Sequence, residues 1–132
     1  MQQVQALDAT MIWDELSLVL MDDRGIAHVH EAHLGSPRPT DVISFAYPPS
    51  PGDSGGHTGE VIVNVERAAR VGPRYQGVTK ELALYIAHGC HHLTGAEDHT
   101  PELRTRMRRI ERGWLKAAAA AGLIEALTVQ PD

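Results

Sequence analysis

The chain has 132 residues, the size of one ordinary domain, and is long enough to bury a hydrophobic core without disulfides or a structural metal ion. Its 12 Lys and Arg residues against 17 Asp and Glu residues give a formal net charge of -5, which excludes nucleic-acid binding through the overall field of the protein. The single cysteine excludes an internal disulfide. The sequence contains no charged-then-apolar leader and no long apolar span, so we expect a cytoplasmic protein without membrane contact. We expect one domain over residues 1–132.

The N-terminal third predicts one short apolar element followed by a helix. Residues 11–21 (MIWDELSLVLM) are apolar, and a run this short can be either a strand or a short helix. Residues 22–25 (DDRG) predict a turn. Residues 25–34 predict a short helix, because Pro37 and Pro39 prevent its continuation.

The middle of the sequence predicts two buried strands. Residues 40–47 (TDVISFAY) and 60–65 (EVIVNV) are rich in β-branched and apolar side chains. The proline- and glycine-rich residues 48–56 between them predict a mobile loop, and we expect His57 beside it to be exposed. Residues 66–71 then predict a helix that Gly72 and Pro73 end.

Two longer helices are predicted in the C-terminal half. Thr79 is a good N-cap for the first, and Gly95 is positioned to end it. One face of this helix is expected to pack inward through residues at helical spacing, namely Leu82, Tyr85, Ile86, Gly89 and Leu93. The second helix, residues 101–122, begins at a favourable proline and is expected to bury Leu103, Met107, Ile110 and Trp114.

Four of the eight histidines fall between residues 88 and 99, and this cluster is the first chemical signal in the sequence. Residues four apart on a helix share a face, so His88 and His92 can present two imidazoles to one ion. A catalytic zinc site uses three protein ligands and a water. Gly95 lets the chain reverse, so that either Asp98 or His99 can supply the third ligand.

The other reading of this histidine pair is a surface or capping role, which is the more common meaning of a lone H-x-x-x-H. The glycine and two candidate ligands that follow favour the metal site. We expect His91 to be solvent-exposed and Cys90 to be a packed thiol. The spacing also resembles that of zinc proteases, but Gly89 stands where their catalytic glutamate must be, which disfavours peptide hydrolysis.

Three segments together resemble the YbeY family of rRNA-maturation endoribonucleases. The family signature H-G-x-L-H-L-x-G-Y-D-H is matched by His88-Gly89-Cys90-His91-His92-Leu93-Thr94-Gly95-Ala96-Glu97-Asp98-His99. Residues 39–45 (PTDVISF) are similar to the family's P-T-D-V-L-S-F, and residues 59–63 (GEVIV) to its G-D-I-V-I strand. The resemblance extends from about residue 16 to residue 115, nearly the whole chain.

The resemblance implies an α+β fold in which helices flank a small mixed sheet, with the metal site on a central helix and the loop after it. It also implies one Zn2+ per chain and an endoribonuclease, a hydrolase that cleaves single-stranded RNA. The implied task is rRNA processing, chiefly at the 3′ end of the small-subunit rRNA, together with ribosome quality control. The expected partners are therefore rRNA and the ribosome or its proteins.

The chain departs from the family pattern at three places. A gapless match puts Asp98 at the third ligand position, with His99 one step late, and so favours Asp98. The family tyrosine is replaced by Ala96. The arginine that precedes the P-T-D block, which the resemblance implies is catalytic, is replaced by Leu34, and Arg38 is the nearest substitute.

Further candidates surround the proposed site. Thr40, Asp41 and Ser44 can line the substrate groove or can cap and hydrogen-bond the start of the strand. The basic stripe of the last helix can contact RNA or can be a solvated face; it consists of Arg104, Arg108, Arg112 and Lys116. Two other functions remain open, a metallohydrolase with a non-RNA substrate and a non-catalytic zinc-binding protein of the ribosome. The number of protein ligands separates catalytic from structural zinc.

Overall fold

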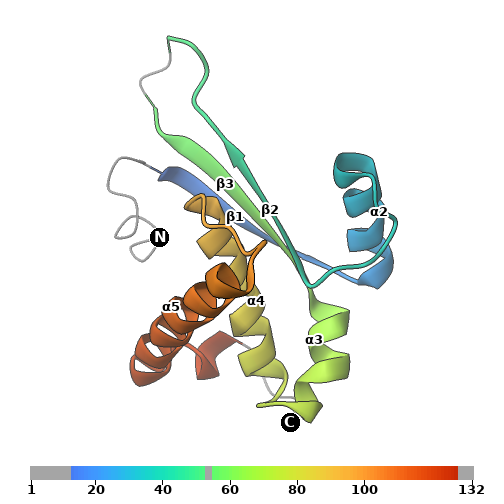
Figure 1. The fold of residues 1–132 in the computed structure, drawn as a ribbon, viewed down its shortest axis with the longest axis vertical. Coiled ribbons are helices and arrows are strands. Elements are labelled where there is room, and N and C mark those ends of the chain that lie inside the picture. The colour runs from blue at the N-terminus through green and yellow to red at the C-terminus, as the bar shows by residue number, and fades with distance from the viewer. Residues whose placement is uncertain (1–12, 53–54, 128–132) are drawn as a thin grey trace.

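The computed structural model describes residues 13–52 and 55–127, in which helices lie on both faces of a small sheet (Figure 1). The elements in chain order are β1 (Trp13–Met21), α2 (Asp23–Leu34), β2 (Val42–Tyr47), β3 (His57–Asn64), α3 (Val65–Val71), the short 3-10 helix η1 (Gly72–Arg74), α4 (Val78–Leu93), α5 (Pro101–Ala120) and the 3-10 helix η2 (Glu125–Leu127). The expected α+β fold with a small mixed sheet is thereby confirmed. No helix in the described ranges is long and apolar enough to cross a membrane.

The sheet has the strand order β1-β3-β2, with β3 in the centre. β3 runs parallel to β1 and antiparallel to β2, so the sheet is mixed. Because both faces of β3 are covered, its buried side chains form a continuous run, in which Val61 and Val63 face one side and Ile62 the other. This explains why the segment reads as an unbroken apolar run rather than an alternating one.

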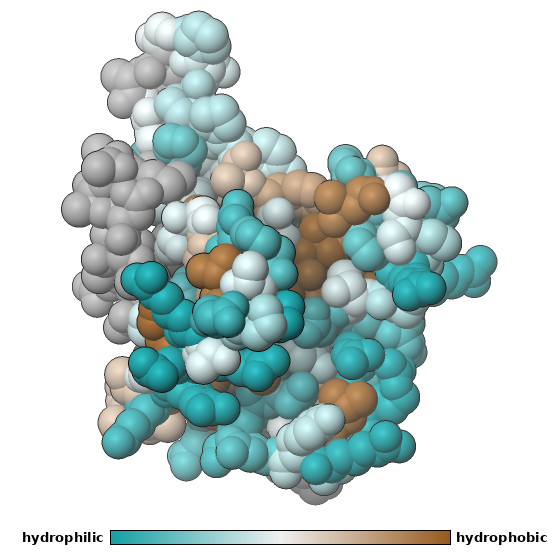
Figure 2. Space-filling model, viewed as in Figure 1, coloured by the Kyte–Doolittle hydropathy of each residue, from teal (hydrophilic) through white to brown (hydrophobic). Residues whose placement is uncertain are grey.

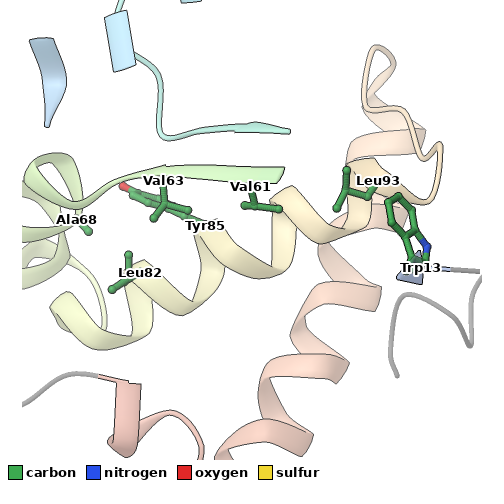
Figure 3. Packing of buried hydrophobic residues seen from close by; sticks show 7 residues of the cluster. All are labelled: Trp13, Val61, Val63, Ala68, Leu82, Tyr85 and Leu93. Carbon is green, nitrogen blue, oxygen red and sulfur yellow. The ribbon is translucent and has the colours of Figure 1, made fainter. Parts of the chain in front are cut away.

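The larger part of the core lies between the sheet and α4 (Figure 3). Its buried members are Trp13, Val61, Val63, Ala68, Leu82, Tyr85 and Leu93. A smaller cluster on the opposite face joins Ile26 of α2 to Ile43 and Ile62. On the surface seen in Figure 2, apolar residues gather where α2 meets β2, while most of the remaining face is hydrophilic.

Three local expectations are corrected by the structure. Asp22 does not begin a separate turn but is the N-cap of α2, and its side chain accepts a hydrogen bond from the Gly25 N–H at 2.7 Å. An N-cap and a turn use the same side-chain chemistry, so the sequence pattern does not separate them. The first long helix begins at Val78 after Gly77, whose φ of 106° turns the chain sharply out of η1, and Thr79 is therefore not the cap. His57 lies in β3, half-buried, with its ring centroid 5.7 Å from that of Trp13.

The remaining boundaries agree with the expectations to within a few residues. Of the first apolar run, residues 11–12 lie outside the described residues, and the rest is strand β1. The predicted loop 48–56 likewise contains residues 53–54, which the structure does not describe. The last helix ends at Ala120 rather than residue 122.

Asn64 at the end of β3 fixes the segment that leads into β2. Its side chain is fully buried and donates to the Thr40 carbonyl at 3.1 Å and to Asp23 Oδ1 at 2.6 Å. Its backbone N–H donates to the Asp41 carbonyl at 2.9 Å. Arg70 donates to the other oxygen of Asp23, and these hydrogen bonds lower the Asp23 pKa to about 2. The position of Asp41, which matters below, is therefore set by a polar network centred on the buried Asn64.

α4 packs closely on the sheet at Gly89. A Cβ at this position would lie 2.6 Å from Val61 Cγ1 and 2.8 Å from Val42 Cγ2, both closer than real contacts allow. The Ser44 hydroxyl donates to the Gly89 carbonyl at 2.7 Å, which anchors the helix at the same point. Because Gly89 faces the sheet, its neighbour His88 is directed away from it, towards α5.

We expect Gly89→Ala to destabilise the protein by about 2 kcal/mol or more, because the added methyl group forces the helix away from two packed valines. Urea unfolding followed by circular dichroism measures this change. Gly113→Ala on α5 is the matched control, since its Cβ would meet nothing within 4 Å. That control should stabilise the helix by about 0.5–1 kcal/mol. Equal effects of the two substitutions would contradict the close approach.

Candidate metal centre

The last two turns of α4 bring two imidazoles together. Nε2 of His88 lies 3.0 Å from Nε2 of His92, and the two ring planes are nearly perpendicular, at 84°. The side chains are 27% and 33% exposed, so the pair is reachable from solvent. The helical spacing of four residues, predicted to place them on one face, does so.

Each ring is held through its other nitrogen by a group that can only accept a hydrogen bond. Nδ1 of His88 donates to the Glu111 carboxylate at 3.0 Å, and Nδ1 of His92 donates to the Ala96 carbonyl at 3.2 Å. With Nδ1 protonated in both neutral rings, both Nε2 atoms direct a lone pair at the same point. Two such lone pairs at 3.0 Å repel one another unless a proton or a cation lies between them.

The Glu111 carboxylate also favours a positive charge at this point. Its hydrogen bond raises the pKa of His88, against the opposing effect of burial, so a positive charge on this ring is favoured. A proton supplies that charge in the simplest case. A divalent cation supplies more, and replaces the proton when it binds.

Asp98 completes a group of three possible ligands. Its Oδ2 lies 3.6 Å from His88 Nε2 and 3.9 Å from His92 Nε2. These separations suit atoms that each lie about 2 Å from a shared ion. Among the described residues, this is the group of His, Cys, Asp and Glu side chains that could hold a metal ion. The donor set, two imidazole nitrogens and one carboxylate oxygen, is a normal zinc set.

His99, the alternative third ligand, points elsewhere. Its side chain is 66% exposed and its Nδ1 lies 3.1 Å from the Glu97 carboxylate. It does not belong to the group of three. The choice of Asp98 as the ligand remains a prediction, and the geometry supports it.

His91 was expected to be exposed, and this is wrong. It is 3% exposed, its Nδ1 donates to Glu111 Oε2 at 2.7 Å, and its ring lies edge-on to Trp114 at a centroid distance of 4.9 Å. The burial is tolerated because the polar nitrogen has a charged partner. Sequence reasoning placed His91 off the metal face correctly but did not identify that this other face packs against α5.

Glu111 itself was missed by the sequence analysis. Burial raises its pKa, but the hydrogen bonds from His88 and His91 outweigh burial and the pKa is lowered, so the carboxylate is ionised. A signal was present in the sequence: Glu111 follows Met107 by four residues and precedes Trp114 by three, which puts an acidic residue on the apolar side of α5.

A cavity of about 270 Å³ is bordered by two of the three candidate ligands, His88 and Asp98. It is lined by Asp41, Leu84, Tyr85, His88, Asp98, Arg104, Met107, Arg108, Glu111 and Arg112. A larger hollow of about 800 Å³ shares Asp41, Leu84, Tyr85, Arg108 and Arg112 with it. The larger hollow has five basic side chains on its walls against two acidic ones; the basic ones are Arg67, Lys80, Arg108, Arg112 and Lys116. An acidic protein thus carries a local basic surface next to the candidate metal site.

The remaining predicted residues are only partly brought to this cavity. Asp41 lines both hollows. Thr40 donates to Asp41 Oδ1 at 3.3 Å, and the Ser44 hydroxyl is used by the Gly89 carbonyl. Arg38 is exposed in the segment between α2 and β2, where its carbonyl accepts from His30 Nδ1 at 2.7 Å, and it does not line the cavity beside His88. The roles of all four stay predictions.

Comparison with known proteins gives a consistent result. Residues 1–119 match the family model described as endoribonuclease YbeY. The chain is 38% identical over 95 residues to an endoribonuclease YbeY of Elusimicrobium minutum and 36% identical over 113 residues to one of Anaeromyxobacter sp.. These alignments cover 70% and 85% of this chain but only 66% and 57% of the two relatives. The chain therefore spans less than two thirds of the length of either relative.

A solved structure has a similar fold. The solution structure of a Thermotoga maritima protein aligns with 98% of this chain and 86% of its own, with a TM-score of 0.52 and 20% sequence identity. At 20% identity, this similarity is evidence for the fold alone.

We expect Asp98→Ala to lower the affinity for Zn2+ more than His99→Ala does, because only Asp98 lies within reach of both imidazoles. Titration of each metal-free variant against a chromogenic chelator measures the two affinities. The two residues are adjacent, so the His99 variant controls for disturbance of the loop. A larger loss for His99→Ala would reverse the assignment.

Proposed function

Since the chain belongs to the YbeY family of endoribonucleases, we propose that it is a metal-dependent endoribonuclease that cleaves single-stranded RNA during rRNA processing in the cytoplasm. Its task is maturation of the 3′ end of small-subunit rRNA and ribosome quality control, in contact with the ribosome or its proteins. One observation carries the proposal: two lone pairs and a carboxylate converge on one point beside a basic hollow.

The cofactor we propose is one Zn2+ per chain, held by His88, His92 and Asp98. When bound, such an ion polarises a phosphoryl oxygen and lowers the pKa of a bound water, the chemistry that phosphodiester cleavage needs. Three protein ligands leave a position open for water or substrate, whereas a structural zinc site is closed by four. This distinction favours the enzyme over a non-catalytic zinc-binding protein.

The protein's own contribution to cleavage is to hold the ligands and the RNA backbone. Arg104 donates to the Asp98 backbone carbonyl at 3.1 Å and so ties the loop carrying Asp98 to α5. Arg108 and Arg112 line both hollows, where they can neutralise phosphates that flank the cleaved bond. The absence of a side chain at Gly89 disfavours peptide hydrolysis by the usual zinc-protease route, because no glutamate fits between α4 and the sheet.

We expect purified protein loaded with Zn2+ to cleave single-stranded fragments of small-subunit rRNA, and His88→Ala/His92→Ala to be inactive and to bind no stoichiometric metal. The double variant should remain folded, since a chain of this length can be stable without metal. Gel analysis of labelled fragments, with metal content from mass spectrometry and folding from circular dichroism, measures all three. Cleavage by the metal-free variant at the wild-type rate would refute the proposal.

The path of the RNA is tested by a second pair of variants. Arg108→Gln/Arg112→Gln should weaken binding to single-stranded RNA and lower the slope of log affinity against log salt by about 1–2, because phosphate contacts release counterions. Arg106→Gln/Arg109→Gln removes the same charge from the same helix, but Arg106 and Arg109 line a different hollow. Equal loss in both pairs, measured by fluorescence anisotropy, would mean that general charge rather than this surface binds the RNA.

A further inference from the structure

Glu111 is the most deeply buried charged residue of the described chain. Its side chain is 2% exposed, on the face of α5 that otherwise packs through Met107 and Trp114. An ionised carboxylate in such a place is costly unless it is fully hydrogen-bonded. An apolar residue would pack the same space more cheaply. Glu111 therefore calls for an explanation beyond the packing of α5 on α4.

The contacts of Glu111 point to the metal site rather than to helix packing. Oε2 accepts from His88 Nδ1 at 3.0 Å and from His91 Nδ1 at 2.7 Å, and Oε1 lies 3.2 Å from His88 Nδ1. Both partners come from α4, one turn or less apart. One carboxylate on α5 thus holds two imidazoles on the neighbouring helix.

The bond to His88 selects one orientation of that ring. An imidazole rotated by half a turn about its Cβ–Cγ bond presents carbon where nitrogen was, and a neutral ring can carry its proton on either nitrogen. A carboxylate accepts only, so it fixes Nδ1 as the protonated atom and leaves the Nε2 lone pair free. That lone pair is the one that meets His92 Nε2 at 3.0 Å.

His91 donates to Oε2, the same carboxylate oxygen that accepts the shorter bond from His88. The His91 ring rests against Trp114 and is 3% exposed, so it is packed between α4 and α5. The carboxylate is therefore fixed in place by a partner that is not itself a candidate ligand.

We propose that Glu111 is a positioning residue of the metal site, which orients His88 through its Nδ1–H and is itself anchored by His91. The inference rests on the metal site proposed above, and deepens it by naming what orients the first ligand. A carboxylate behind a histidine ligand fixes its tautomer and increases its basicity, and loss of such a partner lowers metal affinity by about 10–100-fold.

The central experiment compares Zn2+ affinity of Glu111→Gln with that of wild type, by competition with a chelator. We expect the variant to lose about tenfold or more, because a neutral amide oxygen is a weaker acceptor than a carboxylate and does not increase the basicity of His88. Glu97→Gln is the matched control: Glu97 is 68% exposed and contacts His99, so the affinity should not change. A Glu111→Gln affinity equal to wild type would overturn the proposal.

His91→Leu separates positioning from packing. It removes one hydrogen bond but leaves the carboxylate on His88, so its affinity loss should be smaller than that of Glu111→Gln. A larger loss for His91→Leu than for Glu111→Gln would overturn the proposal, because it would mean that contact between the two helices, rather than the bond to His88, sets the affinity.

A measurement on the unmodified protein keeps the proposal testable if Glu111→Gln does not fold. Long-range 1H–15N correlation of the metal-free protein, at a pH where the imidazoles are neutral, should find His88 protonated on Nδ1; protonation on Nε2 would overturn the inference. Zinc binding by wild type separates the two proposals: absence of any binding defeats the metal site itself, whereas normal binding without an effect of Glu111→Gln defeats only the positioning role.

Discussion

The geometry of the candidate site depends on how closely α4 can approach the sheet. At Gly89 no side chain separates the helix from Val42 and Val61, and the Ser44 hydroxyl fastens the helix backbone at that point. This contact sets the rotation of α4 about its axis. Once the rotation is fixed, positions 88 and 92 must face α5 and the following loop, and position 91 must enter the contact with α5. A zinc-protease motif has its glutamate at this position. Here the sheet lies against Gly89 and leaves no room for a side chain.

Much of this arrangement could be predicted from the sequence, because it depends on local periodicity. The strands β2 and β3, the inward face of α4 and the pairing of His88 with His92 follow from spacing alone. The helix caps were harder to predict from the sequence. The start of α4 is set by the positive φ of Gly77, and a glycine has no side chain that would signal a cap. Thr79 has the side chain of a usual N-cap but is not the cap.

The parts that could not be predicted depend on contacts between elements distant in sequence. The burial of His91 and the role of Glu111 require knowledge of which side of α5 meets which side of α4. A histidine beside a metal-ligand pair gives no sequence signal of its own, and an acidic residue on an apolar stripe has several explanations. Arg38 illustrates the reverse case, since proximity along the chain to the P-T-D segment did not bring it to the cavity beside His88.

The third candidate ligand, Asp98, lies in a different kind of structural element from the two histidines. His88 and His92 belong to a helix that is packed on both the sheet and α5, while Asp98 lies in the short connection between Leu93 and Pro101. An ion that bridges the two parts would cross-link this connection to α4. It would stabilise the folded chain by an amount that rises with the logarithm of its free concentration, about 4 kcal/mol at a thousand times the dissociation constant. The connection between the two helices would then become harder for proteases to cut as metal becomes available. Metal supply would in this way control the lifetime of the protein as well as its chemistry.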